Sequence, residues 1–146
     1  MKLKRSAVFA VCSSLVALTA IVAALSVIGS PDEVRKLKLD EQRVGDLWWI
    51  SNSMERYRCL HDSLPAALDQ LLQPNEPTYG IHIKDPESNE LYEYTRHGSD
   101  AYELCAKFHT TLDATVDSSS FSAFWFHGPG KKCFQMKVHS PGKSRE

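Results

Sequence analysis

The residue types that most often perform chemistry are present in this chain, but their spacing matches no catalytic site. The six histidines show no His-x-x-x-His or mixed Cys/His spacing, the pattern of zinc sites. Gly128-Pro129-Gly130-Lys131-Lys132 lacks the glycine spacing and the Ser or Thr of a phosphate-binding loop. Ser118-Ser119-Ser120 lacks the Gly-x-Ser-x-Gly elbow of serine hydrolases. We therefore predict no catalytic residue, no metal and no cofactor, and a protein that is not an enzyme.

The four cysteines indicate a disulfide more than a redox centre, because the chain has no Cys-x-x-Cys motif. Cys12 lies in an apolar run and is expected to be a reduced hydrophobe. Cys105 and Cys133 both fall on the polar side of predicted strands, so neighbouring strands would bring them together. Loop entropy does not choose between Cys105–Cys133 and Cys59–Cys105, because the stabilisation expected from closing these two loops differs by only about 0.5 kcal/mol. Strand parity favours Cys105–Cys133, which leaves Cys59 as a free or intermolecular thiol.

An uncharged run over residues 7–29 is the main hydrophobic feature. As a helix its 23 residues would extend about 34 Å, enough to cross a bilayer core of about 30 Å. Three basic residues precede the run, and basic residues at the end of a membrane span tend to stay in the cytoplasm. Residues 1–6 are therefore expected to be a cytoplasmic N-terminus. A cleaved signal peptide is the alternative, although its apolar core is usually about 7–15 residues long. We expect a single-pass protein of a bacterial inner membrane, with the lipid bilayer as one partner and the following domain outside.

Residues 30–138 should form one domain, since about a hundred residues support a single core. Ser30-Pro31-Asp32-Glu33 is typical of a helix start, and this helix should end near residues 61–63. We expect Asp40, Arg43 and Asp46 on its solvated side. Its buried face is predicted from apolar residues that recur every three or four positions: Val44, Leu47, Ile50, Met54 and Tyr57.

The rest of the domain changes from helical to strand periodicity. A short second helix is predicted over 64–72, with Leu68, Leu71 and Leu72 on its buried face, and then a loop with a short strand at 81–83. Alternating apolar and polar residues predict strands at 91–96, 101–109 and 132–138, and residues 139–146 are expected to form a flexible tail. The predicted fold class is α+β: an N-terminal transmembrane helix, then an amphipathic helix packed on an antiparallel sheet of three or four strands.

Aromatic residues are the candidate protein-contact positions. One pair lies in the long helix and a cluster lies in the aromatic segment 121–126, before the last predicted strand. Aromatic side chains often dominate protein interfaces. The candidate interaction residues are Trp48, Trp49, Phe124, Trp125 and Phe126.

The order of these features resembles the major pseudopilin of type II secretion and related type IV pilin-like proteins. The resemblance covers about residues 30–110 and rests on the long helix, a Leu64-Pro65-x-x-Leu68-x-x-Leu71 segment, Asp85-Pro86 and a Tyr92-Glu93-Tyr94 strand. It implies a pilin-like fold and a setting in secretion or envelope assembly. No glycine precedes Gly29 and no acid precedes Asp32, so no prepilin peptidase site is recognisable. Some relatives hold calcium in a loop, but Asp113 and Asp117 fall short of the six to eight oxygens that calcium takes.

The predicted function is a non-enzymatic, membrane-anchored interaction domain. Other envelope or secretion proteins are the expected partners, and the chain could also form an oligomer. A formal net charge of -1 gives no reason to expect a nucleic acid. The alternatives are an extracytoplasmic ligand or redox sensor that uses Cys59, or a soluble domain secreted after signal-peptide cleavage.

Overall fold

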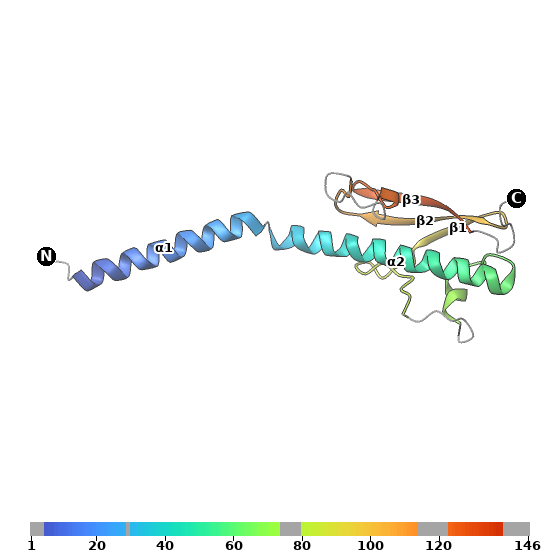
Figure 1. Cartoon of the computed structure of the whole chain (residues 1–146), viewed down its shortest axis with the longest axis horizontal. Coiled ribbons are helices and arrows are strands. Elements are labelled where there is room, and N and C mark those ends of the chain that lie inside the picture. Colours follow the sequence, from blue (N-terminus) through green and yellow to red (C-terminus); the bar gives the residue numbers. More distant parts are fainter. Residues whose placement is uncertain (1–4, 29, 74–79, 114–122, 139–146) are drawn as a thin grey trace, which may run out of the picture. The chain divides into compact units, whose positions relative to one another are not determined.

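The computed structural model describes residues 5–28, 30–73, 80–113 and 123–138 (Figure 1). The chain divides into two compact units, Met1–Arg35 and Lys36–Glu146, which are described separately. Several predicted features lie outside the described residues: the tail at 139–146, the first four residues of the predicted cytoplasmic segment, and Asp117 with most of the polar loop.

The first unit contains helix α1, Arg5–Ile28. The hydroxyls of Ser13, Ser14 and Thr19 donate to backbone carbonyls three or four residues earlier, at 2.9–3.0 Å. This pairing satisfies polar groups on an otherwise apolar helix.

The prediction that residues 7–29 cross a membrane is wrong. Within the part of the chain that the structure describes, no helix is both long and apolar enough to form a membrane span. The predicted transmembrane helix and the single-pass inner-membrane location are corrected accordingly.

The long helix α2, Pro31–His61, begins and ends where the sequence predicts. At its start the Ser30 N–H donates to the Glu33 carboxylate at 3.1 Å, and the Glu33 N–H donates to the Ser30 hydroxyl at 3.2 Å. This reciprocal pair is a capping box. Along the helix, Leu47, Ile50 and Met54 are fully buried, as their spacing predicts.

The predicted second helix is shorter than expected. Only Leu68–Leu72 is helical, as the 3-10 helix η1, because Ala67 before it is extended with φ -151°. Leu68 and Leu71 are buried, but Leu72 is half exposed, since a 3-10 turn does not bring it to the same face. The predicted strand at 81–83 does not form; its two isoleucines are nevertheless buried, and Lys84 pairs with Leu91 in an isolated bridge.

A three-stranded antiparallel sheet completes the described fold, in the order β1-β2-β3. Its strands are β1 (Glu93–His97), β2 (Ala101–Phe108) and β3 (Gly130–Lys137). The hairpin between β1 and β2 turns at Gly98, whose φ of 85° favours glycine. The sheet lies along one side of α2, and η1 lies on another side (Figure 1). The α+β class is therefore confirmed.

The core lies between α2 and one face of the sheet. On β2, the alternate apolar residues that were expected to face the core are all buried: Tyr102, Leu104, Ala106 and Phe108. In the register with β3, Tyr102 pairs with Met136 and Leu104 pairs with Phe134. The main core residues from α2, η1 and the sheet are Leu47, Ile50, Met54, Leu68, Leu71, Tyr102, Leu104, Phe108 and Phe134.

A disulfide joins β2 to β3 on the opposite face of the sheet. Cys105 and Cys133 are directly paired in the register, with Cα atoms 4.0 Å apart, and their sulfur atoms are bonded. The alternative Cys59–Cys105 pair is excluded, since Cys59 is a free, exposed thiol.

Replacement of both bonded cysteines by serine (C105S with C133S) should lower the free energy of unfolding by about 3.6 kcal/mol. The disulfide closes a loop between residues 28 apart, and its loss lets the unfolded chain gain entropy. Urea unfolding under non-reducing conditions measures this change. The control C59S, at an exposed free thiol, should change the free energy by less than about 0.5 kcal/mol. A double variant as stable as the parent would contradict the assigned role.

Candidate functional site

The predicted interaction residues divide between core and surface. Trp125 is only 3% exposed and contacts Phe134, with 5.0 Å between ring centroids, so it is a core residue. Trp48 is partly buried against the core, and Phe126 is half-buried. Trp49 and Phe124 are about half exposed, at 52% and 51%. Of the five candidates, these two offer the largest accessible surface.

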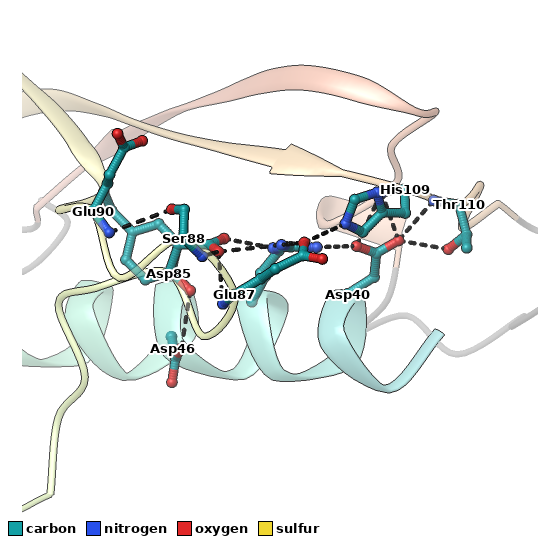
Figure 2. Close-up of polar contacts among 10 residues, drawn as sticks. Asp40, Asp46, Asp85, Glu87, Ser88, Glu90, His109 and Thr110 are labelled. Carbon is teal, nitrogen blue, oxygen red and sulfur yellow. Dashed lines mark hydrogen bonds and ion pairs between the residues drawn. The ribbon is translucent and has the colours of Figure 1, made fainter. Parts of the chain in front are cut away.

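The most elaborate polar site was not predicted. It consists of Asp40, Arg43, Asp85, Glu87 and His109, which we call the Arg43 clamp. Asp40 and Arg43 are 3% and 2% exposed, although the sequence pattern places them on the solvated side of the helix. The clamp joins three segments that are distant in sequence: α2, the loop after residue 84 and the end of β2 (Figure 2).

Arg43 is the centre of the clamp. Its Nε donates to Asp85 Oδ2 at 2.6 Å and its Nη2 donates to Asp85 Oδ1 at 3.2 Å, a bidentate pair. Nη1 donates to Asp40 at 2.8 Å and Nη2 also donates to Glu87 at 2.9 Å. Burial disfavours the charged guanidinium and would lower the pKa of Arg43. The hydrogen bonds to Asp85, Asp40 and Glu87 outweigh burial and raise that pKa above its usual value. The guanidinium is thus already committed to three carboxylates.

Asp40 fastens the end of β2 to α2. Its carboxylate accepts the backbone N–H of His109 at 3.0 Å, the N–H of Thr110 at 2.7 Å and the Thr110 hydroxyl at 2.7 Å (Figure 2). Burial alone would raise the pKa of Asp40, but the bonds from Thr110, His109 and Arg43 hold that pKa below its usual value. The buried carboxylate is therefore stable in its charged form.

Asp85 organises the loop that it belongs to. Its Oδ1 accepts the N–H groups of Glu87 and Ser88, both at 2.9 Å, which forms an Asx turn with Pro86 at its centre. Against the effect of burial, the Arg43 pair and these two N–H groups lower the pKa of Asp85 to about 2. Glu87 then bridges Arg43 and His109, whose Nε2 lies 2.5 Å from the carboxylate. Bonds from His109 and Arg43 lower the pKa of Glu87.

A second buried carboxylate, Asp46, lies one helical turn beyond the clamp. It accepts the Tyr92 hydroxyl at 2.9 Å, and His82 Nδ1 lies 3.3 Å from its other oxygen. Here burial dominates these two bonds and raises the pKa of Asp46. Burial, together with the Asp46 charge, also raises the pKa of Tyr92. Asp46 therefore responds to pH in the opposite sense to Asp40 and Asp85.

The clamp holds structure together and leaves little for chemistry. A cavity of about 350 Å³ opens beside it, lined in part by Arg43, Asp85, Glu87, His109 and Lys131. These groups bind one another or, for Lys131, Glu93 at 2.5 Å. An incoming substrate would have to break those bonds before it could use them.

One group of described residues has the composition of a metal site. Potential ligand atoms of Glu103, Cys105 and Cys133 lie within 4.8 Å of one another. The two sulfurs are bonded to each other, however, and metals bind thiolates. The disulfide form therefore does not provide a zinc-type ligand set.

Comparisons with known proteins do not assign this chain to a family. No protein-family model matches it, and neither a curated protein nor a solved structure is detectably similar. The resemblance to pseudopilins stays a prediction.

Replacing Arg43 with methionine should lower the free energy of unfolding by about 3–5 kcal/mol, because the carboxylates of Asp40 and Asp85 would remain buried without their cation. Thermal or urea unfolding at pH 7 measures the loss. The matched control K131M breaks the Lys131–Glu93 pair, in which both side chains are more than half exposed, and should cost less than about 1 kcal/mol. Equal effects of the two variants would contradict a structural clamp.

Acid should destabilise the domain as the pH falls from about 4 to about 2. The pKa of Asp85 is about 2 in the folded state against an ordinary value of 3.8, so the stability that the charged carboxylate adds is complete above pH 3.8 and is lost as the pH falls through 2. That contribution is about 2 kcal/mol. D85N should lack this contribution at pH 7, and its free energy of unfolding should fall less than that of the parent as the pH is lowered. For Asp46, whose pKa is raised, the sign reverses: stability falls as pH rises above 3.8.

Urea unfolding at pH 7, 4 and 2.5 tests the opposite pH dependences of stability that Asp85 and Asp46 are expected to contribute. D46N keeps an acceptor for the Tyr92 hydroxyl and removes the buried charge, so at pH 7 it should be at least as stable as the parent. Similar losses for D46N and D85N at pH 7 would refute the opposite roles of these two carboxylates.

Proposed function

We propose that the unit from Lys36 onward is a non-enzymatic protein-interaction domain that binds its partners through the exposed side of α2. The carrying observation is Trp49, an indole that is 52% exposed on a helix fixed to the core. Tryptophan contributes large contact area at low entropic cost and is enriched at the centres of protein interfaces.

The neighbouring tryptophan supports Trp49 from within the fold. Trp48 packs against the core, and the two rings meet edge to face with centroids 4.7 Å apart. The core therefore holds Trp48, and the Trp48 ring in turn supports the exposed ring of Trp49. Leu60, three turns later on the same side of α2, is 60% exposed and extends the apolar surface.

The polar site supports a binding role over a catalytic one. Its charged groups neutralise one another, and its effect is to fix the loop 85–90 and the end of β2 to α2. A fixed scaffold under an exposed aromatic residue is the usual arrangement of a binding module. The alternative of a sensor based on Cys59 stays a prediction, and nothing beyond the exposure of that thiol favours it.

Site-specific photocrosslinking in cells tests the proposal. A benzophenone-bearing phenylalanine at position 49 should give a discrete protein adduct, while the same probe at Glu55, exposed on the same helix but about 120° away, should not. W49A should reduce co-purification of the captured partner by about tenfold or more. Because Trp49 is half exposed, this variant should keep its unfolding midpoint within about 2 °C of the parent. No adduct at 49, or equal adducts at 49 and 55, would refute the proposal.

A further inference from the structure

Gly45 is an unexplained residue in the middle of α2. Glycine is among the poorest helix formers, and it usually stands in a helix where another group packs against its backbone. Here a Cβ added to Gly45 would meet no atom within 4 Å. Nothing in the described part of this chain therefore requires the missing side chain.

Gly45 lies one turn before Trp49, about 40° from it around the helix axis. A single helix position without a side chain thus lies beside an exposed indole. We call this surface the Gly45 notch, meaning the side-chain-free position at Gly45 together with the Trp49 ring that borders it. Small residues at such positions allow the backbone of another helix to approach closely.

The charges along the same side of α2 are basic. Lys38 and Arg56 are exposed and lie about 20° from Trp49 around the axis, one on each side of the notch along the helix. The exposed acids Glu41 and Glu55 lie farther round, at about 80° and 120°. A partner that follows this line therefore meets positive charge at both ends of the notch.

This charge pattern disfavours a second copy of the chain as the occupant. In an antiparallel pair that places Trp49 over Gly45, positions 38 and 56 are symmetric about the same midpoint as 45 and 49. Lys38 would then face Arg56 of the other copy twice in each dimer, and facing like charges oppose association.

We propose that the Gly45 notch receives a helix of another protein in which a bulky apolar side chain lies between two acidic residues. The apolar side chain occupies the space above Gly45 and contacts the Trp49 indole. The two acids pair with Lys38 and Arg56. This inference rests on the proposed role of α2 as the interaction surface.

Two substitutions at Gly45 separate an interface role from a structural one. G45A adds a methyl group where nothing in the chain lies within 4 Å, so it should raise the unfolding midpoint by about 4 °C. G45L fills the notch and should reduce the photo-adduct from a benzophenone probe at position 49 by about tenfold or more. The matched control E55L adds the same side chain at an exposed position on α2 and should leave the adduct unchanged.

Mass spectrometry of the crosslinked peptide identifies the occupant. A helical segment with acids on both sides of a large apolar residue, captured with Gly45 and not with G45L, supports the proposal. An adduct that persists in G45L overturns the notch while leaving α2 as an interaction surface. Capture of a second copy, or of a segment without acids, also overturns it, and no adduct at all refutes both proposals.

Discussion

The buried guanidinium of Arg43 is the interaction on which the rest of the polar architecture depends. It donates hydrogen bonds to three carboxylates: Asp40 lies in the same helix, while Asp85 and Glu87 lie in a loop more than 40 residues away in sequence. A buried cation is costly unless it is paired, and buried carboxylates are costly for the same reason. Each therefore requires the others, and the helix, the 85–90 loop and the end of β2 must come together for any of them to be satisfied.

This constraint explains why the domain can combine a small core with a long helix. Apolar residues of α2 cover one face of the sheet, while the clamp fixes the N-terminal part of the same buried face and the disulfide ties two strands on the other side. The binding surface that we propose is the remaining side of α2. It can expose an indole and a glycine because the opposite side of the helix is held by apolar contacts and ion pairs together.

Predictions from local pattern agreed best with the structure. The limits of α2 followed from a capping box, and the hairpin followed from alternation around Gly98, because such signals act between residues close in sequence. The Cys105–Cys133 pair followed from strand parity. The η1 segment was predicted too long, since its proline and leucine pattern does not reveal that Ala67 is extended. The predicted membrane span failed within the described residues.

The sequence by itself determined the limits of α2, the apolar face of that helix and the three strands of the sheet, because hydrophobic periodicity and caps are local properties of a chain. The same spacing extends to two charged residues: Asp40 and Arg43 continue the series of Leu47, Ile50 and Met54 at intervals of three and four, so they share the buried face. Only the tertiary structure decided that these charges are buried, since their partners Asp85, Glu87 and Thr110 come from segments 42 to 70 residues away. The free energy of burying a charge depends on which groups meet it, and that is settled only when distant segments pack together.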